Sequence, residues 1–184
     1  MIGVIKADAY GHGSVKVAEV LRANGCKTFA IATIHEAITL REAGATEEII
    51  LLGLAPDMYA EAIVKYDITP VVCDSSNAAA IDKAAAAAGK LVRGLIAVDT
   101  GMGRIGYLAD EAEAAAEDVK KIQALENFKI KGMFSHMSTA DAYDKTYSHQ
   151  QEEKYNKFYQ TLTAAGIDLS LIHISEPTRL QLIS

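Results

Sequence analysis

The sequence is poor in the residues that define several common classes of protein. Its 184 residues include no tryptophan, two cysteines and three prolines, and only 7% of them are aromatic. Cys26 and Cys73 are too few for a disulfide framework or a cysteine-rich metal centre, so we expect reduced core thiols in a cytosolic protein. No apolar run reaches the ~18 residues of a membrane span, and we recognise no basic-then-apolar leader.

Positive charge is also in short supply. Lysine and arginine total 18 against 24 aspartate and glutamate residues, which gives a formal net charge of −6. This acidic balance argues against nucleic acid or an anionic membrane as a partner. Half of the residues are hydrophobic, and a chain of this length is typical of one domain with a buried core.

Short apolar runs alternate with longer helical patterns along the chain. The runs are rich in valine and isoleucine and predict strands over residues 2–5, 28–32, 49–52, 69–72, 92–98 and 130–134. The helical patterns predict helices over residues 15–23, 35–43, 58–66, 77–88, 111–125 and 147–165. Ser14 is the predicted N-cap of the first helix, and several helices stop at a glycine. This alternation predicts a parallel sheet that is covered on both faces.

Two parallel architectures compete for this pattern. An open doubly wound sheet places a glycine-rich phosphate turn directly after the first strand, whereas Gly11-His12-Gly13 comes too late and lacks a third glycine at the right place. A barrel places reactive residues at the carboxyl ends of several strands, as this sequence does. We therefore predict an α/β fold, a partial TIM (β/α)8-type barrel with about six β/α units.

The first reactive position is Lys6, which ends the first predicted strand. A lysine there can supply the amine that Schiff-base chemistry needs, or it can simply extend its ammonium group into solvent. The following turn, from Tyr10 to Gly13, offers a phenol and exposed backbone N–H groups, which suit a phosphate. His12 lies between the glycines, where its function could be only to order the turn.

The other reactive positions follow the fifth and sixth strands. Arg104 stands in the turn Asp99-Thr-Gly-Met-Gly-Arg, where its guanidinium could bind a carboxylate or phenolate, or pair with Asp99. His136 could stack on a ring, transfer a proton or have no special function. No second histidine or carboxylate lies at a metal-ligand spacing, so we expect no metal site.

The last predicted helix carries polar and apolar side chains of different expected function. His149 lies in a polar stretch with Gln150 and Gln151 that predicts a solvated helix start. Further along, Tyr155 and Tyr159, with Phe158 and Leu162, have the helical spacing of a stripe that faces the core.

Three motifs in order resemble the alanine racemases over about residues 1–168. Lys6-Ala-Asp-Ala-Tyr-Gly-His-Gly is similar to the pyridoxal-phosphate lysine motif of that family. The turn that ends at Arg104 and the segment Phe134-Ser-His136 are similar to its next two signatures. One departure is Ala97, because some members carry a lysine, often carbamylated, seven residues before the arginine.

The resemblance implies functions for four residues. Lys6 would bind pyridoxal 5′-phosphate covalently and serve as one of two bases at the α-carbon of alanine. Tyr10 would contact the cofactor phosphate, Arg104 the phenolic oxygen and the substrate carboxylate, and His136 would pack beside the pyridine ring. The family is cytoplasmic and homodimeric and supplies D-alanine for peptidoglycan.

The resemblance also implies parts beyond this chain. A complete member has seven to eight barrel units and then a β domain, which gives a tyrosine as second base to the partner's active site. We therefore expect residues 1–168 to be an incomplete pyridoxal-phosphate-binding barrel, with the β domain absent. Two alternatives to a racemase are a non-enzymatic pyridoxal-phosphate-binding protein on a single barrel and an inactive fragment.

The end of the chain matches nothing upstream. Residues 169–179 read, residue by residue, as the translation of a transposase-type sequencing adapter, so we expect residues 169–184 not to be native. The alternative is a native tail with a seventh strand over residues 169–174. The genomic DNA across codon 168 distinguishes the two.

Overall fold

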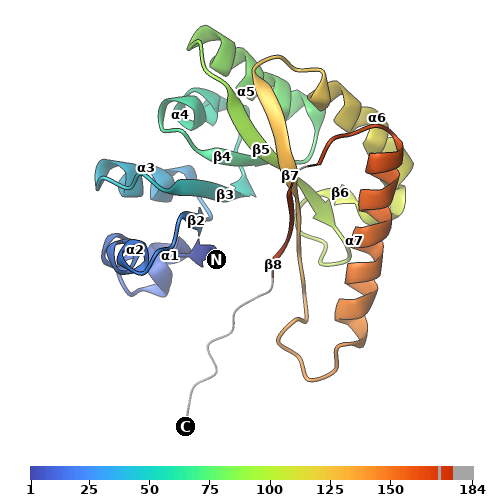
Figure 1. Cartoon of the computed structure of the whole chain (residues 1–184), viewed down its shortest axis with the longest axis horizontal. Helices are drawn as coiled ribbons and strands as arrows, with labels where there is room; N and C mark the ends of the chain where they lie inside the picture. Colours follow the sequence, from blue (N-terminus) through green and yellow to red (C-terminus); the bar gives the residue numbers. More distant parts are fainter. Residues whose placement is uncertain (170, 176–184) are drawn as a thin grey trace.

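The strands form one parallel sheet that curves into an open barrel, with the helices on its outer side (Figure 1). The computed structural model describes residues 1–169 and 171–175. Along the sheet the order is β1 (Gly3–Val4), β2 (Thr28–Ile31), β3 (Glu48–Leu54), β4 (Thr69–Val72), β5 (Val92–Asp99), β7 (Phe128–His136) and β8 (Leu171–Ser175), with β6 (Tyr107–Leu108) beside β5. The predicted fold class, a partial TIM-type barrel, is confirmed.

The helices alternate with the strands. They are α1 (Lys6–Tyr10), α2 (Ser14–Ala23), α3 (Ile34–Glu42), α4 (Ala60–Lys65), α5 (Ser75–Ala87), α6 (Ala112–Gln123) and α7 (Thr146–Ala164), with 3₁₀ turns η1 (Asp57–Tyr59) and η2 (Ala109–Glu111) before α4 and α6. Ser14 is wrong as an N-cap, because α2 already includes it and Gly13 holds the cap position. The Ser14 N–H instead donates to the Asp8 carboxylate at 2.7 Å.

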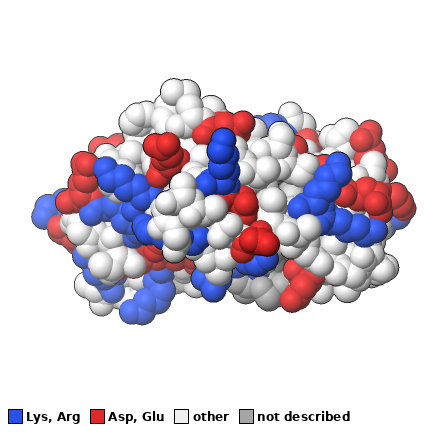
Figure 2. All heavy atoms as spheres, turned by 90° about the horizontal axis from the view of Figure 1, so that it is seen from above, with Lys and Arg blue, Asp and Glu red and all other residues white. Residues whose placement is uncertain are grey.

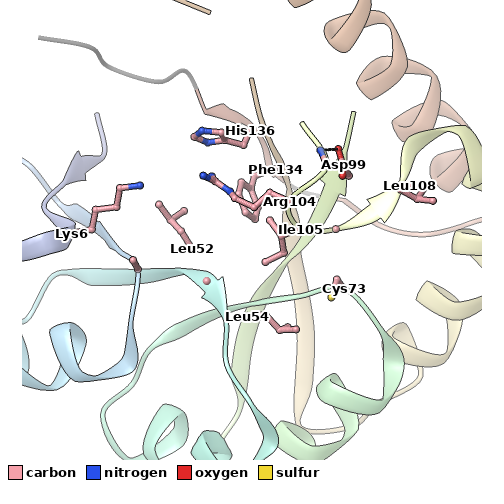
Figure 3. Close-up of a pocket in the computed structure, with 14 residues that line it drawn as sticks. Lys6, Leu52, Leu54, Cys73, Asp99, Arg104, Ile105, Leu108, Phe134 and His136 are labelled. Carbon is pink, nitrogen blue, oxygen red and sulfur yellow. Dashed lines mark hydrogen bonds between the residues drawn. The ribbon is translucent and has the colours of Figure 1, made fainter. Parts of the chain in front are cut away.

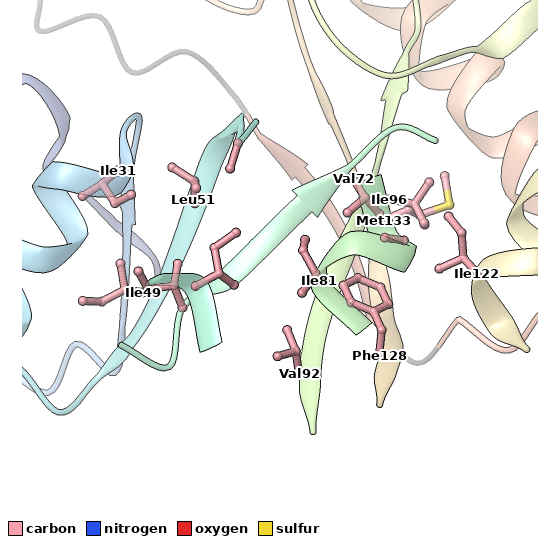
Figure 4. Packing of buried hydrophobic residues seen from close by; sticks show 14 of the residues in the cluster. Ile31, Ile49, Leu51, Val72, Ile81, Val92, Ile96, Ile122, Phe128 and Met133 are labelled. Atoms are coloured by element: carbon pink, nitrogen blue, oxygen red, sulfur yellow. The ribbon is translucent and has the colours of Figure 1, made fainter. Parts of the chain in front are cut away.

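Both faces of the sheet are buried, as predicted, and they form two separate cores. Successive side chains of a strand point to opposite faces. On β3, Ile49 and Leu51 face outward into a large core shared with the helices, whereas Ile50 faces inward into a small barrel interior. Figure 4 shows the large core, whose buried Phe128 is fully enclosed. Each such apolar side chain stabilises the fold by about 1.5–3 kcal/mol.

Local capping fixes where several helices begin and end. Thr33 and Glu36 form a capping box at the start of α3, and Asp74 accepts from the Asn77 N–H at the start of α5. Gly44 follows α3 with φ 86°, a left-handed conformation that ends the helix as predicted.

The end of the described chain adds one strand. β8 pairs in parallel with β7, from Gly132 against Leu171 to His136 against Ser175. It lies where the native-tail alternative placed a strand. Residues 170 and 176–184 of the segment assigned to an adapter lie outside the described residues, so that assignment stays a prediction.

The surface and the thiols have few special features. Acidic and basic side chains intermingle on the face shown in Figure 2. Cys26 is buried, Cys73 is half-buried, and both are free thiols.

Within the described residues, no helix is long and apolar enough to cross a membrane.

Candidate active site

A cavity of about 750 Å³ opens at the carboxyl ends of the strands (Figure 3). Strand periodicity explains its lining. The inward positions of β7 continue from Phe134 to His136, and Lys6 continues the inward positions of β1 in the same way. The lining residues are Lys6, Ala32, Leu52, Gly53, Leu54, Cys73, Asp99, Gly103, Arg104, Ile105, Gly106, Leu108, Phe134 and His136.

Lys6 stands directly before an unusual turn. Residues 7–10 all have positive φ, between 51° and 55°, so α1 is a short left-handed turn rather than an ordinary helix. Non-glycine residues rarely adopt this conformation, which explains why no periodicity predicted it. The lysine side chain points from this turn into the cavity (Figure 3).

Hydrogen bonds hold the turn from both sides. The Ala9 N–H donates to the Ile5 carbonyl at 3.0 Å, and the Gly13 N–H donates to the Asp8 carbonyl at 2.9 Å. The Ala7 N–H donates to Oε1 of Glu36 on α3 at 2.6 Å. The turn after Lys6 is therefore held by contacts within residues 5–13 and by Glu36 of α3.

Arg104 lies in a loop that Asp99 shapes. Oδ1 of Asp99 accepts from the N–H groups of Gly101 at 2.8 Å and Gly103 at 3.0 Å. Gly101 has φ 131° and lies against Tyr147, whose hydroxyl donates to its carbonyl, so a larger residue does not fit there. Among the described residues, Arg104 forms no hydrogen bond or ion pair, so the alternative of a structural pair with Asp99 is not observed.

The pKa of His136 is shifted by its surroundings in the cavity. Burial lowers its pKa below 6.5, and the nearby positive charges of Arg104 and Lys6 lower that pKa further. Its ring lies beside Arg104 in Figure 3. These effects all favour the neutral form of the His136 ring.

Gln151 of α7 joins the ends of β5 and β7. Its side chain is fully buried, and Nε2 donates to Thr100 Oγ1 at 3.1 Å and to the His136 carbonyl at 3.4 Å. Its Oε1 accepts from the Ser138 N–H and hydroxyl, both at 2.9 Å. The amide thus ties the segment before Arg104 to the backbone of His136.

Two other positions singled out in the sequence, Tyr10 and His12, lie outside the cavity lining. Tyr10 is 54% exposed and does not line the cavity that contains Lys6, Arg104 and His136. The His12 ring contacts the Ala9 carbonyl at 2.9 Å, which fits the prediction that it orders the turn.

The donors of the cavity suit an anionic ligand with a flat ring. Lys6 and Arg104 carry basic side chains, and Phe134 and Leu52 provide apolar surface. Among the described residues, the one acidic side chain in the lining, Asp99, already accepts from two N–H groups. A phosphorylated pyridine such as pyridoxal phosphate has these properties. No group of three or more histidine, cysteine, aspartate or glutamate side chains that could hold a metal occurs among the described residues.

Two supporting residues escaped the sequence analysis. Gln151 was included in a solvated helix start, which is wrong for this residue, although His149 is exposed as predicted. The signal was present, because Gln151 extends the buried stripe of Tyr155, Phe158 and Leu162 at helical spacing. For Glu36, the Thr33-Ile-His-Glu pattern of a capping box was also readable, but its contact with Ala7 was not.

The fold and the residues of the cavity together identify a class of protein. A curved parallel sheet with lysine, arginine and histidine at its carboxyl ends is typical of a catalytic domain of the (β/α) barrel type. Residues 1–177 match the family model of the alanine racemase N-terminal domain. The chain belongs to this family.

Individual relatives agree with the family model. The alanine racemase of Clostridium novyi is 43% identical over 175 residues, which is 95% of this chain and 45% of that protein. The solved alanine racemase of Clostridium difficile 630 superposes with a TM-score of 0.90 at 36% identity, over 95% of this chain and 45% of that one. A histidine racemase from Leuconostoc mesenteroides has a TM-score of 0.84 at 27% identity, over 95% of this chain and 46% of that one. The chain thus spans less than half the length of these relatives.

Proposed function

We propose that the protein is an alanine racemase that interconverts L- and D-alanine with pyridoxal 5′-phosphate as cofactor. The observation that carries this proposal is that Lys6, Arg104 and His136, from three distant parts of the sequence, line one cavity of a parallel barrel. When bound, pyridoxal phosphate supplies an electron sink for the charge that develops at the substrate α-carbon.

The lining residues have complementary functions in this proposal. Lys6 holds the cofactor through its amine and moves the proton at one face of the α-carbon. Arg104, whose guanidinium has no partner among the described residues, binds the substrate carboxylate and the phenolic oxygen of the cofactor. The lowered pKa of His136 favours its neutral form, which can pack on the pyridine ring without adding a charge.

The remaining parts of the proposal concern the phosphate and the second base. Tyr10 is proposed to contact the cofactor phosphate from the turn that follows Lys6. A two-base reaction needs a second proton donor on the opposite face, and we propose a tyrosine from the C-terminal β domain of a partner subunit in a homodimer. The product D-alanine would serve peptidoglycan synthesis in the cytoplasm.

A racemisation assay tests the proposal. The complete gene product, incubated with pyridoxal phosphate and L-alanine, is expected to form D-alanine, and Lys6→Ala is expected to abolish this because the amine is lost. Residues 1–184 alone are expected to be inactive, since the second base lies elsewhere. Serine and histidine are assayed in parallel, because the similar structures include a histidine racemase.

Two results would contradict it. Cofactor binding by the complete protein without turnover of any amino acid would favour the non-enzymatic pyridoxal-phosphate-binding protein. Racemisation that survives in Lys6→Ala would remove the lysine from the reaction.

A further inference from the structure

The carboxylate of Glu36 joins the turn after Lys6 to the end of the neighbouring strand. One oxygen, Oε1, accepts from the Ala7 N–H at 2.6 Å. The other, Oε2, accepts from the N–H groups of Ala32 at 2.8 Å and Thr33 at 3.0 Å, just after β2. One half-buried side chain therefore binds three backbone donors from two segments of the barrel.

Helix capping explains only part of this arrangement. A capping box needs the carboxylate of Glu36 on the Thr33 N–H, and the Thr33 hydroxyl accepts in return from the Glu36 N–H at 3.4 Å. The bond to Ala7, 29 residues earlier in the sequence, adds nothing to the cap of α3. Its effect is on the turn that begins at Ala7.

That turn needs external support. Ala7 has φ 51° and ψ 49° and opens a run of four left-handed residues, which L-amino acids disfavour. In the left-handed turn the Ala9 N–H reaches back to the Ile5 carbonyl, whereas the Ala7 N–H has Glu36 as its acceptor. The bond fixes the peptide plane between Lys6 and Ala7, and with it the direction in which the lysine leaves the backbone.

We propose that Glu36 is a positioning residue for Lys6, which aims the lysine amine at the cofactor by holding the Ala7 N–H. This inference rests on the proposed function of Lys6. A carboxylate is required because all three partners are donors. A glutamine would turn its own N–H₂ group towards at least one of them.

The test compares Glu36→Gln with two controls in the complete gene product. Thr33→Ala removes the reciprocal half of the capping box and leaves the bond to Ala7, and Glu42→Gln removes an exposed charge from the same helix. Pyridoxal phosphate is titrated against each variant by absorbance, thermal unfolding is recorded, and kcat and KM for alanine are measured separately.

We expect Glu36→Gln to weaken pyridoxal phosphate binding about ten-fold, the effect of losing a charged hydrogen bond, and to lower kcat more than it changes KM. Thr33→Ala is expected to lower the melting temperature with cofactor affinity unchanged, and Glu42→Gln to change neither. If Glu36→Gln does not fold, Glu36→Asp is tested in its place. The shorter aspartate side chain keeps the charge but cannot reach both the Ala7 N–H and the backbone after β2.

The outcomes separate this inference from the proposed function. Wild-type affinity in Glu36→Gln, or an equal loss in Thr33→Ala, would mean that Glu36 only caps a helix. Failure of the wild-type protein to bind pyridoxal phosphate would overturn the proposed function of the cavity, and this inference with it.

Discussion

At the scale of single residues, His136 reports the electrostatics of the cavity. Its pKa is lowered first by burial and then by Arg104 and Lys6. An anionic cofactor would offset both cations, so the histidine should respond to each group that enters or leaves the cavity. The protonation of His136 also makes the stability of the protein depend on pH.

Removing a neighbouring cation is expected to raise the pKa of His136. In Arg104→Met the pKa should move up towards 6.5, because one of the charges that oppose protonation is lost. Titration of the imidazole C–H signals by NMR, with His136→Asn to assign them, measures the shift. An unchanged or lower pKa in Arg104→Met would show that Arg104 does not face the histidine.

The lowered pKa of His136 also determines how the free energy of unfolding changes with pH. Between the lowered pKa and 6.5 the unfolded chain binds more protons at this histidine than the folded chain does. The contribution of His136 to the free energy of unfolding therefore rises with pH through that interval and is constant above it. In His136→Asn this part of the pH dependence should disappear.

At the scale of elements, Asp118 of α6 joins α5 and β6. Its carboxylate accepts from the Ser75 hydroxyl at 2.7 Å, the Ser75 N–H at 2.8 Å and the Tyr107 hydroxyl at 2.8 Å. Burial raises the pKa of Asp118, but the hydrogen bonds from Ser75, Lys121 and Tyr107 together outweigh it and lower the pKa to about 2. The first turn of α5 is thereby fixed to α6.

Asp118→Asn should destabilise the protein by about 2 kcal/mol at neutral pH, because it weakens several charged hydrogen bonds. The wild-type contribution is complete above 3.8 and is lost as the pH falls towards about 2, since the unfolded carboxyl binds protons first. Urea unfolding at several pH values measures both effects. Asp110→Asn, which removes only an exposed ion pair with Lys154, should destabilise the protein far less than Asp118→Asn does. Equal losses in the two variants would contradict the network.

The sequence predicted the elements better than their contacts. The six strands and the six longer helices are all present, because apolar runs follow from burial of both faces of a strand and helical patterns from burial of one face of a helix. The left-handed α1 and the two-residue β6 were not predicted, since each depends on tertiary hydrogen bonds rather than on an apolar pattern. The burial of Gln151 could have been predicted from its place in the stripe of Tyr155.

At the scale of the whole molecule, the sheet is an open arc. In the described part of the chain, β1 and β8 lie at its two ends and do not pair with each other. The candidate cavity is nevertheless lined by residues from Lys6, just after β1, to His136 at the end of β7, so motifs that are far apart in the sequence surround one cavity. Lys6, Arg104 and His136 could be predicted as neighbours because carboxyl ends of parallel strands share one edge. The position of Tyr10 outside the lining could not, because it depends on the left-handed turn.

The central claim is that this cavity binds pyridoxal phosphate through Lys6. The most direct measurement is borohydride reduction of the complete gene product with pyridoxal phosphate, followed by peptide mass spectrometry. The account predicts a pyridoxyl group on the peptide that contains Lys6, with little on surface lysines such as Lys16 and none at this position in Lys6→Ala. Labelling spread evenly over the lysines, or an unlabelled Lys6 in the folded protein, would contradict it.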